Sequence, residues 1–221
     1  VQVSAGHVYH PDKSSYHVLD VYRPQGNAIL PAVLLVHGSA PASAELKDQA
    51  PFTSWGRLVA AAGMAAITFN WDYRDPTDLD YVIAYLQANA ETLGLTMQRV
   101  GLVAFSAGVE TSLPWALADQ SGALRSLVAY YGDLRTTADT LASAEPGGTP
   151  QMLIARGARD EIIRDDHLQA FSDAAVRRNI RVQVETHPEG VHAFDLRNDD
   201  ETTRSIIANT LTFLRTNLGV S

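Results

Sequence analysis

The sequence predicts an α/β fold, a doubly wound, mostly parallel sheet flanked by helices, and two observations along the chain predict it. Short apolar runs bounded by Gly, Pro, Asn or Asp recur, as is typical of strands covered on both faces. Segments with apolar residues at helical spacing lie between these runs. The alternation continues through all 221 residues without a break in composition, so a single domain over residues 1–221 is expected.

Seven segments are expected to form the strands of this sheet. From the second onward they are mostly continuous apolar runs, except that the last one, "RVQVET", alternates as an edge strand does. The segments are His17–Tyr22, Val33–His37, Met64–Asn70, Val100–Phe105, Leu127–Tyr131, Met152–Arg156 and Arg181–Thr186.

Apolar stripes at helical spacing predict helices that cover the sheet. One stripe spans Leu79–Leu93 and another spans Ile207–Leu218. A third helix, Leu168–Arg178, follows Asp165 and Asp166, whose carboxylates favour the positive end of its dipole.

The connection between two of the strands limits what can cover the site. About 20 residues separate the strand that ends at Tyr131 from the strand that begins at Met152. This is too few for a folded lid domain, so no large lid is expected and the cleft should be open.

Composition excludes several classes of partner and of chemistry. The formal charge of −8 and the lack of a basic cluster make nucleic acid and anionic membranes poor partners. The absence of cysteine removes disulfides, thiolate zinc sites and a cysteine nucleophile. No apolar run approaches the roughly 18 residues of a membrane span. The chain starts at Val1 without methionine, which is compatible with a removed leader, so the compartment stays open, as does the oligomeric state.

The stretch "VGLVAFSAGVE", residues 100–110, sets a serine directly after a strand, with the small residues Ala104 and Gly108 two positions away on either side. Small neighbours permit a sharp strand-to-helix turn that exposes the hydroxyl of Ser106, which indicates a nucleophile. The alternative is a serine that merely caps a helix after a strand. Pro114 lies inside the helix that follows, so that helix is expected to kink or end near Thr111.

A serine nucleophile needs an imidazole to accept its proton and a carboxylate to orient that imidazole. Asp160 lies in the loop after one predicted strand, and His187 and His192 lie in "HPEGVHAFD" after the next. Loops after parallel strands gather at one edge of the sheet, where Ser106 also lies. The chain order Ser, Asp, His is the one expected of this fold.

These motifs resemble the α/β-hydrolase superfamily, and within it the small serine esterases and dienelactone-hydrolase-like enzymes. The matching pieces occur in family order over nearly the whole chain. They are "LDVYRP" (19–24), "VLLVHGSA" (33–40), "FNWDYRD" (69–75), "DLDYVIAYL" (78–86), "VAFSAG" (103–108), "IARGARDEII" (154–163) and "EGVHAFD" (189–195).

Two departures from the family pattern limit what the resemblance implies. Ala104 stands at the first glycine of the elbow, a change that some lipases of the superfamily share. The best-known dienelactone hydrolases use a cysteine nucleophile, which this chain lacks, and this favours ordinary ester hydrolysis over lactone hydrolysis.

An oxyanion hole needs two hydrogen-bond donors. The backbone N–H of Ala107, at a helix start after the serine, is a natural first donor. The resemblance implies that the backbone N–H of Ser39 is the second, with Gly38 permitting a sharp turn. His37 is expected to brace this loop.

The acid and the base each have competitors. His192 is favoured over His187 because Gly190 gives its loop freedom and "GVHAF" matches the family. Asp160 competes with three other carboxylates. Glu161 is expected to be solvated, and Asp165 belongs to a helix start. Asp133 follows a strand after which some superfamily members carry their acid.

Residues after strand ends are candidates for the wall of the substrate pocket. These are Trp71, Tyr131, Glu161, Val191 and Phe194. Trp71 could equally pack beneath the cleft. His7 and His10 have the spacing of a metal pair, but without further ligands nearby a solvated loop is favoured, and no metal site is expected.

The sequence therefore predicts a serine hydrolase that cleaves carboxylic esters of small molecules through a Ser-His-Asp triad and an acyl-enzyme, without metal or organic cofactor. Short acyl chains, acetyl to butyryl, are expected because there is no lid to build a deep tunnel. Lactones, acetylated sugars, and peptidase or acyltransferase activity with the same triad are alternatives. A non-catalytic binding module should have lost a triad member, whereas all three are present.

Overall fold

The computed structural model describes residues 1–11, 16–41, 44–119, 121–143, 150–162 and 165–220. Within these residues eight strands form one sheet in the order β1-β2-β4-β3-β5-β6-β7-β8. Strands β3 to β8 run parallel, whereas β2 pairs antiparallel with both β1 and β4. The strands are β1 (Gln2–Val8), β2 (Val18–Arg23), β3 (Leu30–Val36), β4 (Ala65–Phe69), β5 (Leu95–Phe105), β6 (Leu124–Tyr130), β7 (Gln151–Gly157) and β8 (Val182–His187).

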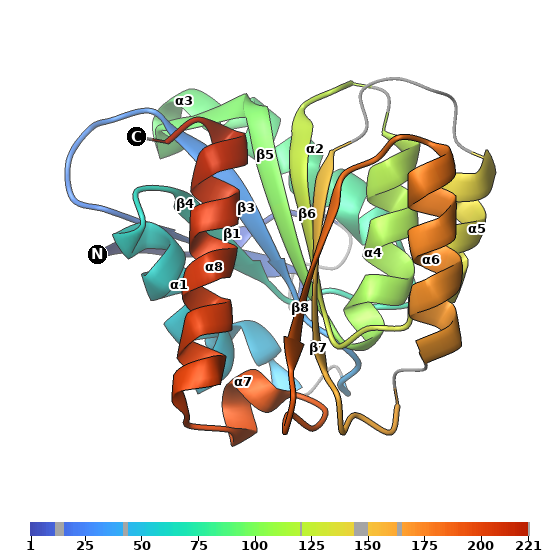
Figure 1. The fold of residues 1–221 in the computed structure, drawn as a ribbon. Coiled ribbons are helices and arrows are strands. Elements are labelled where there is room, and N and C mark those ends of the chain that lie inside the picture. The colour runs from blue at the N-terminus through green and yellow to red at the C-terminus, as the bar shows by residue number, and fades with distance from the viewer. Residues whose placement is uncertain (12–15, 42–43, 120, 144–149, 163–164, 221) are drawn as a thin grey trace.

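Helices cover both faces of this sheet (Figure 1). Helices α1 and α8 pack on one face, and α2, α4, α5 and α6 lie on the other. The predicted doubly wound architecture is thus confirmed. The helices are η3 (Leu46–Asp48), α1 (Ala50–Ala61), α2 (Thr77–Ala88), α3 (Ala90–Leu93), α4 (Ala107–Ala118), α5 (Arg135–Ser143), α6 (Asp165–Arg177), α7 (Phe194–Arg197) and α8 (Glu201–Leu218).

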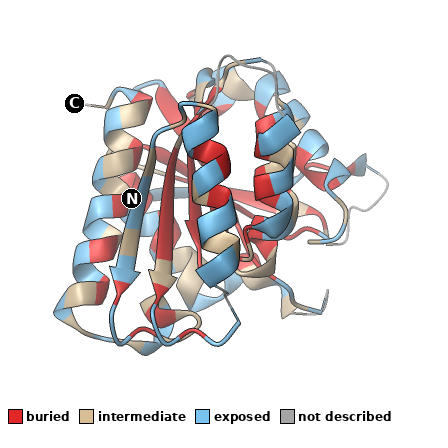
Figure 2. Cartoon of the chain, turned by 45° about the vertical axis from the view of Figure 1, so that its right-hand side comes forward, coloured by how far each residue is buried: buried red, intermediate tan, exposed pale blue. Residues whose placement is uncertain are grey.

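The core is divided in two by the sheet. Every residue of β3 and β4 is buried, which explains why these strands read as unbroken apolar runs. One core lies beneath α1 and α8 and the other beneath α2 and α4, and Figure 2 shows buried residues on the central strands and exposed residues on the outer sides of the helices. Each fully buried aliphatic side chain stabilises the fold by roughly 1.5–3 kcal/mol.

Two predictions about elements need correction. The apolar stripe over Leu79–Leu93 forms two helices, α2 and α3, with Asn89 between them. Of the kink or end expected near Thr111, the end is wrong, because helix α4 continues through Pro114 to Ala118. Leu113 and Ala116 are buried in the core on either side of the proline, so packing holds the helix despite the missing hydrogen bond.

The strand arrangement brings several loops to one edge of the sheet. Strands β3, β5, β6, β7 and β8 are neighbours in that order and run parallel, so the loops after their carboxyl ends lie side by side. Strand β8 is an edge strand, as its alternating sequence predicted. The residues of the candidate site come from these loops.

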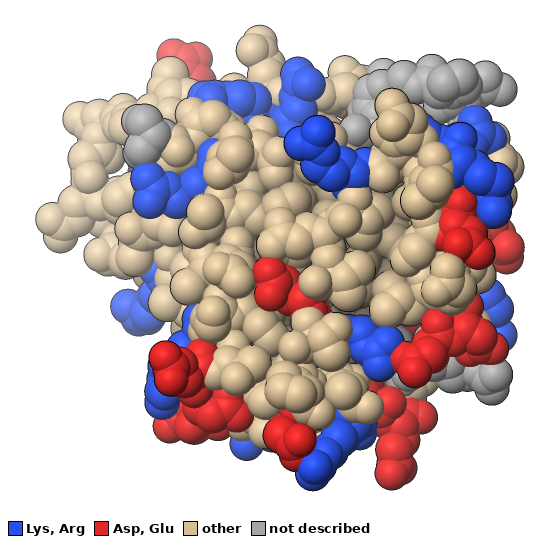
Figure 3. All heavy atoms as spheres, viewed as in Figure 1, with Lys and Arg blue, Asp and Glu red and all other residues tan. Residues whose placement is uncertain are grey.

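The surface and the helices give two further observations. Basic and acidic side chains are interspersed on the face seen in Figure 3. Among the described helices, none is both long and apolar enough to span a membrane.

Candidate active site

Ser106 lies at the sharp turn from β5 into α4. Its backbone angles are φ 52° and ψ −130°, a conformation that costs a non-glycine residue about 1–3 kcal/mol. The backbone N–H of Ser106 donates a hydrogen bond of 2.9 Å to the carbonyl of Tyr130 at the end of β6, which joins the turn to the neighbouring strand. A Cβ on Gly108 would lie 2.6 Å from the carbonyl oxygen of His37, so glycine is needed for these segments to meet. The turn therefore presents the partly exposed Ser106 side chain at the sheet edge.

A chain of hydrogen bonds joins Ser106, His192 and Asp160. The distance from Ser106 Oγ to His192 Nε2 is 2.9 Å, and that from His192 Nδ1 to Asp160 Oδ2 is also 2.9 Å. The other oxygen of Asp160 accepts the backbone N–H of Ile162 at 2.8 Å. The Asp160 side chain has no exposed surface, whereas 21% of the His192 side chain is exposed. This network suits a neutral imidazole with its proton on Nδ1, leaving Nε2 free to accept from the serine hydroxyl.

Two glycines let the loops that carry Asp160 and His192 cross in contact. A Cβ on Gly157 would lie 2.2 Å from the carbonyl oxygen of Gly190, an approach that only glycine allows. The backbone N–H of Arg159 donates to the same carbonyl at 2.9 Å. These contacts pack the loop that carries Asp160 directly against the loop that carries His192.

The competing histidine lies elsewhere. His187 is buried, and its Nε2 contacts both carboxylate oxygens of Asp200 at 3.1 and 3.0 Å. Asp200 caps the start of α8 by accepting the backbone N–H of Thr203. His187 therefore ties the end of β8 to α8.

The competing carboxylates also lie apart from His192. Asp133 pairs with His167 at 2.8 Å, and Asp165 forms an ion pair with Arg156. Glu161 is exposed. Among the carboxylates considered, the described hydrogen bonds join Asp160 to the Nδ1 of His192.

The two candidate oxyanion donors lie on segments in contact. Ala107 is the first residue of α4, where a backbone N–H has no carbonyl partner within the helix. Ser39 is exposed and follows Gly38, where a Cβ would lie 2.9 Å from Ser106 Cβ and 3.3 Å from the Ala107 nitrogen. The loop of Ser39 thus runs beside the serine turn.

His37 is built into the support of this loop. Its Nδ1–H donates to the carbonyl of Gly38 at 2.8 Å, and its own carbonyl accepts the indole N–H of Trp71 at 3.1 Å. Burial lowers the pKa of His37 to about 4, so its imidazole is neutral at pH 7. His37 therefore acts structurally beneath the loop.

The predicted pocket residues fall in different environments. Glu161 is exposed and Val191 is half-buried. Trp71 is almost entirely buried but lines a groove beside Ser39. Tyr131 is buried, with its ring centroid 4.9 Å from that of His192. Phe194 has no exposed surface and packs in the core against Tyr130 and Tyr131. It therefore does not line the pocket wall, and the prediction for this residue is wrong.

The groove beside Ser39 has a volume of about 640 Å³ and is lined by both aromatic and polar side chains. They include Tyr16, Ser39, Trp71, Asp72, Tyr73 and Arg74. The guanidinium of Arg74 lies 4.8 Å from the centre of the Tyr73 ring, in cation–π contact.

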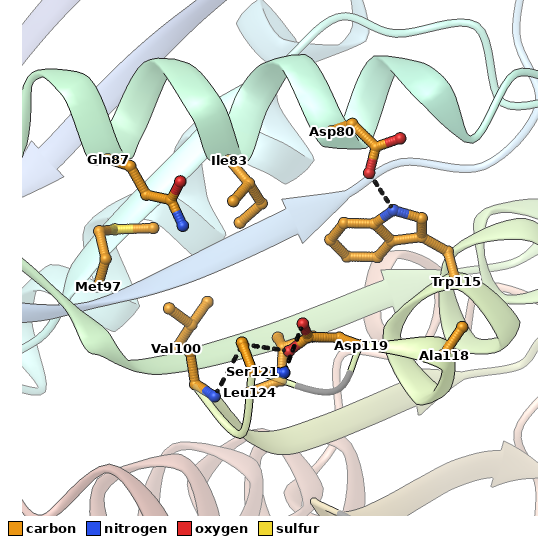
Figure 4. A pocket seen from close by; sticks show the side chains of 11 residues that line it. Asp80, Ile83, Gln87, Met97, Val100, Trp115, Ala118, Asp119, Ser121 and Leu124 are labelled. Carbon is orange, nitrogen blue, oxygen red and sulfur yellow. Dashed lines mark hydrogen bonds between the residues drawn. The ribbon is translucent and has the colours of Figure 1, made fainter. Parts of the chain in front are cut away.

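A second cavity, of about 350 Å³, lies away from these residues between α2 and α4, near the middle of β5 (Figure 4). Ile83, Met97 and Leu124 give it apolar walls, and the indole N–H of Trp115 donates to Asp80 at its rim. Val100, which lines it, is six positions before Ser106 on the strand, so this cavity does not belong to the same site.

The histidines near the N-terminus have other partners. His7 contacts the hydroxyls of Ser4 and Tyr85 at 2.7 and 3.0 Å, and His10 packs against the ring of Tyr81. Among the described residues, no three or more histidine, aspartate or glutamate side chains are grouped so that they could hold a metal ion.

One cluster beside His192 was not predicted from the sequence. The carboxylate of Asp195 accepts hydrogen bonds from the indole of Trp55 and the hydroxyl of Tyr131, at 3.0 and 2.8 Å. Burial raises the pKa of Asp195 above its usual range. The only local signal is an acidic residue next to an apolar one in "HAFD", because its partners are more than 60 residues away along the chain.

Comparison with solved structures shows which fold this is. The chain matches a putative dienelactone hydrolase from Klebsiella pneumoniae with a TM-score of 0.76 and 19% identity, covering 97% of this chain and 99% of that one. A truncated carbohydrate esterase from gut microbiota matches with a TM-score of 0.75 and 16% identity, over 98% and 97% of the two chains. These matches confirm the α/β-hydrolase fold.

A longer protein contains a similar unit. The bifunctional GH43-CE protein of Bacteroides eggerthii matches with a TM-score of 0.76 and 17% identity. The match covers 96% of this chain, which spans 38% of the length of that protein.

Sequence comparison identifies the family. No curated protein shows significant sequence similarity to this chain. The model of the dienelactone hydrolase family matches residues 55–216, which is most of the chain and includes Ser106, Asp160 and His192. The chain therefore belongs to the dienelactone hydrolase family and is a hydrolase of carboxylic esters.

Proposed function

We propose that the protein hydrolyses esters through an acyl-enzyme formed on Ser106. The Ser106 oxygen attacks the ester carbonyl while Nε2 of His192 takes its proton, and Asp160 stabilises the imidazolium that results. The backbone N–H groups of Ser39 and Ala107 stabilise the oxyanion of the tetrahedral intermediate. His192 then returns the proton to the departing alcohol. Water, activated by the same imidazole, releases the acid and restores the serine.

The observation that carries this proposal is the unbroken hydrogen-bonded chain, 2.9 Å at each link, from the Ser106 hydroxyl through His192 to Asp160. A nucleophile and a base within hydrogen-bond reach, with the base oriented by a third group, is the arrangement that activates a serine hydroxyl. The strained backbone of Ser106 supports the same role, since strained residues concentrate at active sites.

Short acyl esters are the proposed substrates. In the described part of the connection from β6 to β7, residues 131–143 and 150, the chain forms the short helix α5 over Arg135–Ser143, which cannot form a deep hydrophobic tunnel by itself. With the N–H of Ser39 bound to the substrate carbonyl, one part of the ester extends along the groove beside Ser39. The polar lining of this groove suits a small or hydroxylated group better than a long alkyl chain.

Acetylated carbohydrates are the second candidate substrates. The groove offers hydroxyl, carboxylate and guanidinium groups from Tyr16, Asp72 and Arg74 beside aromatic walls, a combination that can hydrogen-bond to sugar hydroxyls. The similarity in fold to a carbohydrate esterase is compatible with this substrate class.

The test is the steady-state kinetics of purified protein on p-nitrophenyl esters with acyl chains of two to twelve carbons, on peracetylated sugars, and on a small lactone and an amide. We expect the highest kcat/KM at two to four carbons, and loss of activity in Ser106→Ala. Ser54→Ala, an exposed serine on α1, is the matched control and keeps full activity. Activity that persists in Ser106→Ala contradicts the mechanism, and a maximum at ten carbons or more contradicts the short-chain proposal.

A further inference from the structure

Three segments far apart in the chain meet at the carboxylate of Asp195. Its Oδ2 accepts the indole N–H of Trp55 on α1 at 3.0 Å, and its Oδ1 accepts the hydroxyl of Tyr131, directly after β6, at 2.8 Å. Asp195 itself lies in the first turn of α7, three residues after His192. The steps of the proposed hydrolysis do not use this carboxylate.

Tyr131 links this cluster to the imidazole. The rings of Tyr131 and His192 are 4.9 Å apart at an interplanar angle of 64°, an edge-to-face contact. Tyr131 has a positive φ of 42°, rare for a tyrosine, and its backbone N–H donates to the carbonyl of Ala155 on β7 at 2.8 Å. Its backbone and its hydroxyl are therefore both held, which leaves the ring a single place against His192.

The chain between His192 and Asp195 is constrained as well. Ala193 has a φ of 58°, in the left-handed region, and Phe194 is completely buried in the core. With Asp195 bonded to Trp55 and Tyr131, the peptide that carries His192 is fixed at both the buried phenylalanine and the carboxylate. A serine and an imidazole 2.9 Å apart need such a support, because misplacement by about 1 Å can cost a hundredfold in rate.

The position of a carboxylate here has a cost that these contacts offset. Burial raises the pKa of Asp195, and the hydrogen bonds from Trp55 and Tyr131 act in the opposite direction. An apolar residue would avoid the desolvation penalty but could not bind both donors. This favours a role in which the two hydrogen bonds themselves are required.

Resting on the proposed function, we propose that Asp195 is a positioning residue. Through its hydrogen bonds to Tyr131 and Trp55, it holds the Tyr131 ring against His192 and fixes the loop that keeps Nε2 in line with Ser106 Oγ.

The experiment compares Asp195→Ala and Asp195→Asn with the wild type and with Asp199→Asn as the matched control. Asp199 is an exposed carboxylate in the same segment, paired with Arg204. For each protein we would measure kcat and KM on p-nitrophenyl acetate, the rate of inactivation by a fluorophosphonate, and Tm. Asparagine can accept from Trp55 with its oxygen and donate to the Tyr131 hydroxyl, so it retains both links without the charge.

We expect Asp195→Ala to lower kcat and the inactivation rate by roughly ten- to a hundredfold while KM changes by less than about threefold. Asp195→Asn should recover activity to within about threefold of the wild type, and Asp199→Asn should equal it. Tyr131→Phe combined with Asp195→Ala should be no worse than Asp195→Ala alone, because both break one network.

Two results would overturn the proposal. One is a wild-type kcat in Asp195→Ala. The other is an Asp195→Asn variant that folds with the wild-type Tm but is as slow as Asp195→Ala. Ser106→Ala in the same series separates the two hypotheses, since residual activity there refutes the serine mechanism, whereas an inactive Ser106→Ala beside a fully active Asp195→Ala refutes the positioning role alone.

Discussion

Substituting Gly38 by alanine tests the contact between the proposed oxyanion loop and the serine turn. A Cβ at this position would lie 2.9 Å from both the Phe105 oxygen and Ser106 Cβ, and 3.3 Å from the Ala107 nitrogen. Ordinary carbon contacts are about 3.5–4.0 Å, so the two segments must separate by about 0.5 Å or more. All three neighbouring atoms belong to or adjoin the backbone, so no side chain can rotate away to relieve the clash.

The separation moves the N–H of Ser39 away from that of Ala107, and loss of one oxyanion donor costs about a hundred- to a thousandfold in kcat. We therefore expect Gly38→Ala to lower kcat at least about fiftyfold, with KM changed by less than about threefold. Overpacking should cost about 1–3 kcal/mol of stability.

The assay is steady-state hydrolysis of p-nitrophenyl acetate together with urea unfolding. The matched control is Gly101→Ala on β5, the strand that leads into the serine turn, where a Cβ would meet Ser126 Oγ at 3.0 Å far from the turn. The control should lose stability but keep its kcat. A Gly38→Ala protein with kcat within threefold of the wild type would refute the assignment of this loop to the oxyanion site.

Two further predictions follow from the site. Asp160→Asn should lower kcat by about a thousandfold or more, because the amide favours the wrong imidazole tautomer. Asp133→Asn, the control, should keep kcat within about twofold of the wild type in the same steady-state assays. Equal losses of kcat in the two variants would contradict the assignment of Asp160 as the acid. His37 has a folded-state pKa of about 4 against an unfolded value near 6.5, so the unfolded state binds more protons between these pH values and stability falls as pH drops. Urea unfolding gives the free energy of unfolding at pH 8 and at pH 5. Between these two pH values it should fall by about 2 kcal/mol more in the wild type than in His37→Asn. An equal fall in both proteins would contradict the burial argument.

The fold could be predicted from local patterns because the central strands are buried on both faces. All seven expected strands are present with ends shifted by a few residues, and the alternating "RVQVET" does lie at an edge. Strand β1 was missed because its residues are nearly all exposed, so the apolar pattern that reveals a buried strand is missing there. The split of the stripe at Asn89 and the continuation of α4 through Pro114 depend on tertiary packing, which local spacing does not contain.

The candidate site was partly predictable from the order of the strands along the chain. Ser106, Asp160 and His192 follow parallel strands, so topology alone brings their loops to one edge, and their catalytic roles stay predictions. Phe194 was expected in a pocket wall because it follows a strand, but the turn at Ala193 directs it into the core. The Asp195 cluster joins residues up to 140 positions apart, and nothing in local periodicity marks such a contact.

Site-specific mapping of a covalent adduct tests the central claim most directly. The protein would be treated with a fluorophosphonate, digested, and analysed by mass spectrometry, with Ser106→Ala as the parallel sample. The account predicts one equivalent of phosphonyl group on the peptide that contains Ser106 and no adduct in the variant. An adduct on another residue, or labelling that persists in Ser106→Ala, would contradict it.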